Sequence, residues 1–157
     1  MRHIKIFKVS HPNSLSEWYK IVSPFKVIFN GGIVYVCRLL PSLALKRFLL
    51  RLTGMRIGKN VSIGFMAMFD VMFPELISIS DNTVIGYNST ILAHEFLIKE
   101  YRLGKVEIGK NVMIGASSLV LPGVKISDGA TISAMSLVNK DVPKNAFVGG
   151  VPAKKLK

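Results

Sequence analysis

The sequence predicts an all-β fold with an α-helical N-terminal region, in which the all-β part is a parallel β-helix. An apolar residue recurs at every sixth position from Ile108 to Val138. The same spacing runs through Ile57, Ile63 and Phe69, and again through Ile79, Ile85 and Ile91. Residues 1–56 lack this repeat. A six-residue period is typical of a parallel β-helix, in which each coil has three short strands.

Residues 1–56 form a basic, apolar N-terminal region. They contain ten of the 21 lysines and arginines and a single acidic residue, Glu17, so they carry nine of the twelve net positive charges. The pattern of apolar residues predicts two amphipathic helices, at about 16–37 and 41–53. Glycines, charges and a proline interrupt the apolar stretch, which is too short for a membrane-spanning helix.

Two roles for this region remain open. The helices either cap the β-helix or pack on a neighbouring subunit, or they lie on an anionic membrane surface. No nucleic-acid-binding motif accompanies the positive charge, so no nucleic-acid partner is expected. Cys37, the only cysteine, lies in an apolar run and is expected to be a buried thiol. The expected location is the cytoplasm, with the inner face of the cell membrane as the alternative.

Residues 57–157 form the predicted β-helix domain. In each hexad the apolar first residue points inward, so that residues 18 apart stack in successive coils. Glycine, asparagine or aspartate commonly follows this residue, as in Ile-Gly-Lys-Asn-Val-Ser at 57–62. We interpret these residues as corner positions that require a positive φ angle.

The repeat is interrupted twice. Between Ile91 and Ile108 the spacing is not a multiple of six, and this stretch contains His94 followed by a predicted loop at 95–105. Between Phe69 and Ile79 a shorter interruption contains Asp70. Interruptions of a regular scaffold are expected where it has been modified for function.

The motifs at 108–126, 140–143 (Lys-Asp-Val-Pro) and 149–154 (Gly-Gly-Val-Pro-Ala-Lys) resemble those of the hexapeptide-repeat acyltransferases. These include the bacterial galactoside, maltose and serine O-acetyltransferases and capsule-type polysaccharide acetyltransferases. The resemblance covers about residues 55–157. It implies a left-handed β-helix, a homotrimer with active sites between subunits, acetyl-coenzyme A as donor, and a hydroxyl or amino group as acceptor.

The resemblance places His94 at the position of the family's catalytic histidine. A sugar hydroxyl is a poor nucleophile, and an imidazole can accept its proton at neutral pH. Asp70 is expected to bind the acceptor or orient His94, with a corner-capping role as the alternative. Glu95 is expected to orient the imidazole, bind the acceptor or remain solvated.

The resemblance also implies the residues that bind the donor. Ala116 and Ala134 match positions whose backbone contacts the pantetheine arm, and their spacing of 18 residues places them one coil apart on one edge. The remaining matches, at the nucleotide and phosphate end, are Asn139, Lys140, Lys154 and Lys155. Met135 replaces a family glycine beside the edge that carries Ala116 and Ala134. Met68 replaces an acceptor-binding asparagine of the family.

The sequence therefore predicts an acetyl-coenzyme A-dependent O-acetyltransferase that acts on a sugar or polysaccharide precursor, with His94 as general base. The alternative is a scaffold with weak or no activity that docks to a membrane or a partner protein. No metal is expected. A γ-type carbonic anhydrase needs three zinc-binding histidines, and His94 is the only histidine in the repeat region.

Overall fold

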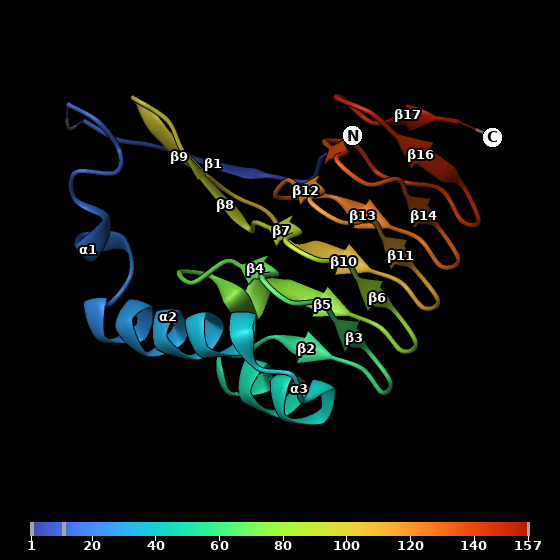
Figure 1. The fold of residues 1–157 in the computed structure, drawn as a ribbon. Coiled ribbons are helices and arrows are strands. Elements are labelled where there is room, and N and C mark those ends of the chain that lie inside the picture. Colours follow the sequence, from blue (N-terminus) through green and yellow to red (C-terminus); the bar gives the residue numbers. More distant parts are fainter. Residues whose placement is uncertain (1, 11, 157) are drawn as a thin grey trace.

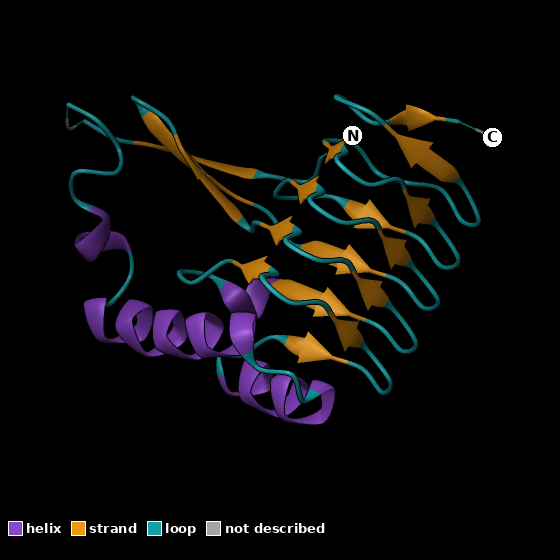
Figure 2. Ribbon diagram, in the orientation of Figure 1, coloured by secondary structure: helices purple, strands orange, loops and turns teal. Residues whose placement is uncertain are grey.

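The computed structural model describes residues 2–10 and 12–156, which form a parallel β-helix with helices at one end. The strands stack in three parallel sheets, and the chain visits sheets I, II and III in turn (Figures 1 and 2). Sheet I contains β2 (Arg56–Ile57), β5 (Ile77–Ile79), β10 (Val106–Ile108) and β13 (Lys125–Ile126). Sheet II contains β3 (Ser62–Ile63), β6 (Val84–Ile85), β11 (Met113–Ile114), β14 (Thr131–Ile132), β16 (Phe147–Gly149) and the antiparallel β17 (Lys154–Lys155). Sheet III contains β4 (Met68–Phe69), β7 (Thr90–Ile91), β12 (Leu119–Val120) and β15 (Leu137–Val138).

The apolar first residue of each hexad forms the core. In sheet I, Ile57, Ile79, Ile108 and Ile126 are paired in register, and all are buried. Ile114 pairs with Ile132 and Val120 pairs with Val138, each 18 residues apart. The predicted stacking is therefore confirmed, since one inward side chain from each strand fills the narrow interior.

The corners differ from the sequence interpretation. Positive φ angles fall on the fourth residue of the hexad, at Asn60, Met66, Asn82, Asn88, Asn111, Ser117, Gly129 and Met135. The glycine at the second position has no positive φ and serves a different purpose. A Cβ atom added to Gly86 would lie 2.6 Å from the carbonyl oxygen of Ile114 in the next coil. These glycines are therefore required because neighbouring coils approach closely, and our prediction of a positive φ there was wrong.

Three helices precede the β-helix: α1 (Trp18–Ile21), α2 (Pro24–Leu39) and α3 (Leu43–Leu52). The helix predicted at 16–37 is thus divided, because Val22 is extended and Ser23 has non-helical backbone angles before Pro24 begins α2. Ser42 caps α3, its hydroxyl accepting a hydrogen bond from the Leu45 amide. Cys37 is buried, as expected, and burial raises the pKa of its thiol.

Helix α3 closes the first coil with basic side chains. Lys46 donates to the carbonyls of Ile63 and Gly64, Arg47 to that of Val61, and Arg51 to those of Ile57 and Gly58. Buried backbone carbonyls at the end of a sheet need such donors. These three basic side chains therefore donate to backbone carbonyls of the β-helix itself.

Residues 5–8 form a strand that the sequence analysis did not predict. Strand β1 (Lys5–Lys8) pairs antiparallel with β9 (Glu100–Leu103), which in turn pairs with β8 (His94–Phe96). The predicted loop at 95–105 is thus largely a β-hairpin, and β1 extends it to a three-stranded sheet that projects from the β-helix (Figure 1). The N-terminal region is consequently not purely helical.

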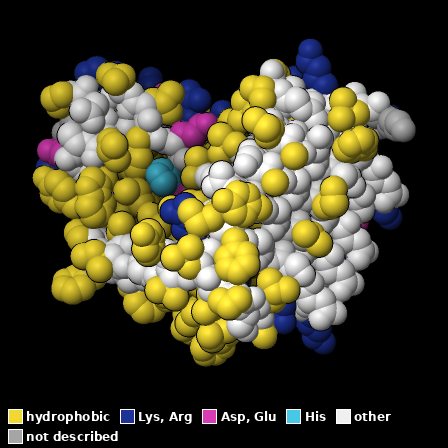
Figure 3. All heavy atoms as spheres, in the orientation of Figure 1, with side chains coloured by type: hydrophobic (Ala, Val, Ile, Leu, Met, Phe, Trp, Pro, Cys, Tyr) yellow, Lys and Arg dark blue, Asp and Glu magenta, His cyan; other side chains and the backbone are white. Residues whose placement is uncertain are grey.

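Helix α2 leaves much of its apolar surface uncovered. Phe25 is 86% exposed, and Ile28 and Tyr35 are also exposed. In Figure 3, hydrophobic side chains gather over the half of the molecule that contains the helices. None of the helices in the described residues is long and apolar enough to span a membrane.

Candidate active site

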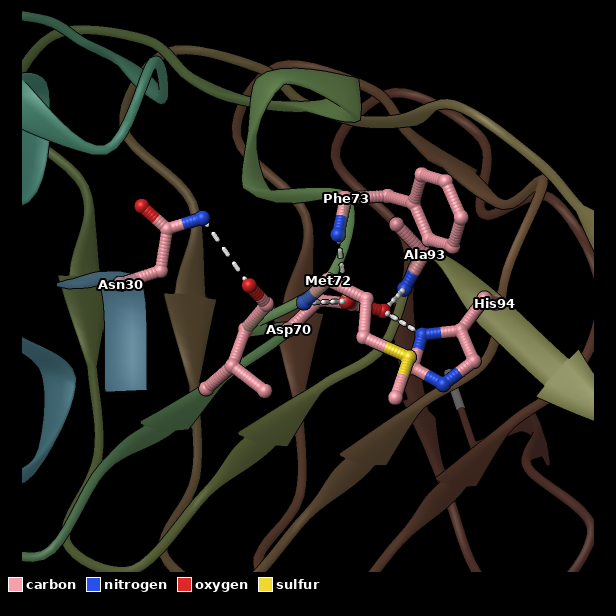
Figure 4. Close-up of polar contacts among 7 residues, drawn as sticks. Asn30, Asp70, Met72, Phe73, Ala93 and His94 are labelled. Atoms are coloured by element: carbon pink, nitrogen blue, oxygen red, sulfur yellow. Dashed lines mark hydrogen bonds and ion pairs between the residues drawn. The ribbon is translucent and has the colours of Figure 1, made fainter. Parts of the chain in front are cut away.

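Asp70 and His94 meet at the two interruptions of the repeat. The chain leaves sheet III after β4 at Asp70 and leaves it again after β7 at His94, one coil later. A carboxylate oxygen of Asp70, Oδ2, lies 2.5 Å from Nδ1 of His94 (Figure 4). The structure therefore brings together two side chains that the sequence analysis selected separately.

The Asp70 carboxylate is fully enclosed by hydrogen-bond donors. Oδ1 accepts from the amides of Met72 and Phe73, each at 2.9 Å, and Oδ2 also accepts from the Ala93 amide at 2.8 Å. Burial alone raises the pKa of Asp70, but the hydrogen bond and charge interaction with His94, together with the backbone amides, outweigh this effect. The pKa of Asp70 consequently lies below its usual value, so the carboxylate is charged at neutral pH.

Two aromatic rings contact the imidazole. The rings of Phe73 and Phe96 make edge contacts with His94, with centroids 5.6 and 5.1 Å away. When Nδ1 donates to a carboxylate, the neutral ring keeps its lone pair on Nε2. This arrangement suits Nε2 for accepting a proton from a bound hydroxyl.

Glu95 lies on the other face of the hairpin. Adjacent residues of a strand point to opposite faces, so the Glu95 carboxylate is directed away from the His94 imidazole. It pairs with Arg2 at 2.7 Å, and Arg102 lies 4.0 Å from its second oxygen. Of the two predicted carboxylates, the structure brings only Asp70 to His94.

Asn30 supports the same site and was missed by the sequence analysis. Its side chain is buried in α2, and Nδ2 donates to the carbonyl oxygen of Val71 at 2.9 Å (Figure 4). The buried residues of α2 are Asn30, Val34 and Cys37, which share one helical face. A polar residue on the buried face of an apolar helix was the signal available in the sequence, because it requires a specific partner.

The predicted donor-binding residues are distributed over two edges of the β-helix. Ala116 and Ala134 lie at successive corners between sheets II and III, and the Met135 amide donates to the Ala116 carbonyl at 2.8 Å. They are stacked one coil apart, as the 18-residue spacing predicts. Asn139 and Lys140 lie at the corner that follows sheet III, on the same edge as His94 but nearer the C-terminus.

A cavity of about 440 Å³ brings several of the C-terminal residues together. Asn139, Lys140 and Lys155 line it with Lys144, whereas Lys154 does not. The side-chain oxygen of Asn139 is buried and has no hydrogen-bond partner among the described residues. The cavity therefore offers lysine charges and an unused acceptor, which fit a ligand carrying phosphates and a donor group.

The two methionines that replace family residues lie in different environments. Met135 has a φ of 56° and is 75% exposed beside Ala134. Met68 lies in β4 and packs against the core. Met135 therefore borders the Ala116–Ala134 edge, whereas Met68 contributes to packing beside Asp70.

Comparisons with known proteins agree with this architecture. The sequence model of the family described as "Bacterial transferase hexapeptide (six repeats)" matches residues 105–140. The acetyltransferase-family protein YvoF of Bacillus subtilis (strain 168) is 52% identical over 153 residues, which cover 97% of this chain and 89% of YvoF. A second acetyltransferase-family protein, SAS0727 of Staphylococcus aureus (strain MSSA476), is 43% identical over 143 residues, which cover 90% of this chain and 89% of SAS0727.

Solved structures share the fold. The hexapeptide-repeat acetyltransferase VCA0836 of Vibrio cholerae, complexed with acetyl-coenzyme A, aligns with a TM-score of 0.70 at 20% identity, covering 94% of this chain and 92% of its own. A galactoside acetyltransferase in complex with coenzyme A gives a TM-score of 0.70 at 23% identity, with 98% and 86% covered. The likeness to these structures implies a left-handed β-helix. Because YvoF is 52% identical over 97% of this chain, the chain belongs to the hexapeptide-repeat acetyltransferase family.

Proposed function

We propose that the protein transfers an acetyl group from acetyl-coenzyme A to a hydroxyl of a sugar or polysaccharide precursor, with His94 as general base. The observation that carries this proposal is the Asp70–His94 pair, which fixes one ring nitrogen and leaves the other for catalysis. Coenzyme complexes of structurally similar acetyltransferases support the choice of donor.

The proposed reaction has two steps. Nε2 of His94 accepts the hydroxyl proton while the acceptor oxygen attacks the thioester carbonyl, which forms a tetrahedral intermediate. The carbon–sulfur bond then breaks, and the imidazolium returns its proton to the leaving thiolate. Asp70 stabilises the imidazolium through Nδ1 and keeps its ring orientation. The products are the acetyl ester and free coenzyme A.

We assign donor binding to Ala116, Ala134, Asn139, Lys140, Lys154 and Lys155. Backbone groups at the Ala116 and Ala134 corners suit the amide-rich pantetheine arm. The lysines supply positive charge for phosphates, and the cavity at Asn139 supports their grouping. Lys154 follows from the sequence resemblance, because the structure does not place it in that cavity.

We propose that the active protein is a homotrimer with shared active sites. Within one chain, His94 lies on the edge between sheets III and I, whereas Ala116 and Ala134 lie on the edge between sheets II and III. We therefore expect a bound acetyl-coenzyme A to contact both alanines of one chain and to reach His94 of a neighbouring chain. The hairpin that carries His94 projects from the β-helix, which suits it to cover a neighbouring subunit (Figure 1).

The exposed face of α2 supports subunit packing over membrane binding. Large exposed apolar surfaces are typical of interfaces. Most basic side chains nearby are already engaged: those of α3 bind carbonyls, Lys20 pairs with Glu17, and Lys26 pairs with Glu75. The exception is Arg38 in α2, whose buried Nε has no hydrogen-bond partner among the described residues. Light scattering should give three times the chain mass. Salt-sensitive co-sedimentation of the full chain with anionic vesicles would support the membrane role instead.

The catalytic proposal is tested by the His94→Ala variant. Thiol release from acetyl-coenzyme A with a sugar acceptor should fall by roughly 10²- to 10⁴-fold, the usual contribution of a general base. Lys59→Gln, at an exposed corner, is the matched control and should retain full activity. Unchanged turnover in a folded His94→Ala protein would overturn the mechanism.

A further inference from the structure

A second cavity, of about 550 Å³, lies between β1 and the strands β10 and β13 of sheet I. Its apolar wall includes Phe7, Leu76 and Leu103, and its charged groups are Lys5, Lys105, Lys125 and Glu107, beside the imidazole of His3. The cavity depends on β1, because both Lys5 and Phe7 belong to that strand. It is separate from the C-terminal cavity that we assign to the donor.

The three lysines of this cavity outnumber the acids beside them, which are Glu107, opposite Lys125 in the β10–β13 pair, and Asp141. Among residues 2–10 and 12–156, no acidic side chain lies within ion-pair distance of Lys5, Lys105 or Lys125. Asp141, at the edge of the cavity, accepts from the Lys125 amide and lies 3.2 Å from Nε2 of His3. Three lysines against Glu107 and Asp141 leave one net positive charge at the cavity, so it attracts anions.

The strand register connects this cavity to His94. Lys5 lies opposite Leu103 in the β1–β9 pair, and Leu103 lies opposite His94 in the β8–β9 pair. Directly opposed residues of antiparallel strands share one face, so the three side chains form a single row. Two strand spacings separate the backbones of Lys5 and His94 by about 10 Å.

The next row on the same face is aromatic. Phe7 stacks on Tyr101 with ring centroids 4.7 Å apart, and Tyr101 contacts Phe96, whose ring touches His94. The face therefore combines a base at one side, an apolar and aromatic surface, and a lysine cluster at the other side. A sugar ring suits an aromatic surface, and a phosphate or carboxylate suits the lysines.

We propose that this cavity binds an anionic group, a phosphate or a carboxylate, of the acceptor whose hydroxyl is presented to His94. The inference rests on the proposed acetyl transfer and adds the substrate class, an acidic or phosphorylated sugar. The lysines bind the anion without taking part in the chemistry, so they are specificity determinants rather than catalytic residues.

Anion binding is tested first, without turnover, by titrating inorganic phosphate and following backbone amide signals by NMR. Saturable shifts should concentrate at Lys5, Leu103 and Lys125 and disappear in the double variant Lys5→Gln/Lys125→Gln. Lys59→Gln, which removes another exposed lysine at a distant corner, should leave them intact. Weak shifts spread equally over surface lysines, Lys59 included, would overturn the proposed site.

Acceptor kinetics then identify the source of the anion. Methyl α-glucoside and α-glucose 1-phosphate offer the same free hydroxyls, and galacto- and manno-configured pairs extend the comparison. The phosphorylated member should be favoured in kcat/KM by about tenfold or more, the usual value of a charge-assisted contact. The double variant should remove this preference through the acceptor KM, with the donor KM unchanged.

Other kinetic outcomes contradict the inference in distinguishable ways. A raised KM for acetyl-coenzyme A, with no change for the acceptor, would assign the cavity to phosphates of the donor and overturn our assignment. Equal kcat/KM values for the neutral and the phosphorylated sugar of each pair would also overturn the proposed anion site. If no sugar is acetylated while phosphate still binds at Lys5 and Lys125, the proposed sugar acceptor fails and the anion site stands.

Discussion

Nδ2 of Asn30 in helix α2 donates to the carbonyl of Val71, one residue after the carboxylate that holds His94. This contact ties the N-terminal region to the segment 70–73, where the amides of Met72 and Phe73 bind Asp70. The N-terminal helices therefore help to position the candidate base.

Replacing Asn30 with alanine should loosen this segment. The Val71 carbonyl would lose its donor, which we expect to lower the free energy of unfolding by about 1–3 kcal/mol. The kcat should fall by up to about 100-fold, because small displacements of a catalytic group are costly, while the donor KM should stay constant. Denaturant titration and initial rates test both effects. Lys59→Gln, at an exposed corner outside α2, is the control, and an equal loss of kcat in both variants would contradict the positioning role.

Asp70→Asn should separate the charge of the carboxylate from its shape. We expect kcat to fall by roughly 10²- to 10⁴-fold, because the imidazolium loses its counter-charge and its preferred tautomer. Asp128→Asn, at a corner far from His94 along the chain, should retain activity. Comparable activity of Asp70→Asn and the parent protein would show that the pair is structural.

The lowered pKa of Asp70 also predicts that the stability of the protein depends on pH. The pKa of Asp70 is lowered in the folded protein, so its charge stabilises the fold above the ordinary carboxyl pKa of about 4. This contribution is lost as the pH falls through the folded-state pKa. Urea titrations of the parent and Asp70→Asn should therefore differ most near neutral pH and converge in acid. A difference that is constant down to pH 2 would contradict this assignment.

Lys46 is expected to stabilise the capped end of the β-helix. Its buried ammonium donates to Ile63 and Gly64 at 3.0 and 3.2 Å and lies 4.8 Å from the centre of the Phe65 ring. Burial lowers its pKa. Lys46→Met keeps the aliphatic stem but leaves both carbonyls without this donor, so we expect a loss of roughly 2–4 kcal/mol in unfolding free energy. Lys20→Met, at an exposed ion pair, should change stability by less than about 1 kcal/mol, and equal effects of the two changes would contradict the capping role.

Two glycines should respond oppositely to alanine. A Cβ atom on Gly86 would enter the backbone of the next coil, so Gly86→Ala should destabilise the fold by at least about 1–3 kcal/mol. Nothing lies within 4 Å of a Cβ on Gly31 in α2. Gly31→Ala should therefore stabilise the protein by about 0.5–1 kcal/mol, through better helix propensity. Thermal melts of both variants test the pair, and a stabilising Gly86→Ala would refute the close-approach explanation.

Much of the scaffold was predictable because its information is local. The inward residue of each hexad is set by a six-residue period, and pairs such as Ile108 and Ile126 follow from that spacing alone. The conformational reason for the glycines was not predictable in the same way. Close approach between coils is a property of the stacked structure. The positive φ falls on the fourth residue of the hexad, where asparagine, serine, glycine and methionine, including Met135, all occur, so no single residue type marks it in the sequence.

The candidate site was predictable only in part. His94 and Asp70 stand at interruptions of a regular repeat, so the sequence marked both residues as candidates. Their contact depends on where two irregular segments leave adjacent coils, which the repeat does not specify. Asn30 and strand β1 lay outside the repeat, and their partners Val71 and β9 are distant in sequence.

The sequence by itself determined the parallel β-helix and the stacking of residues 18 apart, because periodic burial of apolar side chains encodes them. It marked His94 only through the larger interruption of that period. Only the tertiary structure decided that Asp70 rather than Glu95 meets His94, and that β1 places Lys5 on the face of the imidazole. Strand alternation and cross-strand register impose those choices, and both become defined only when the chain is folded.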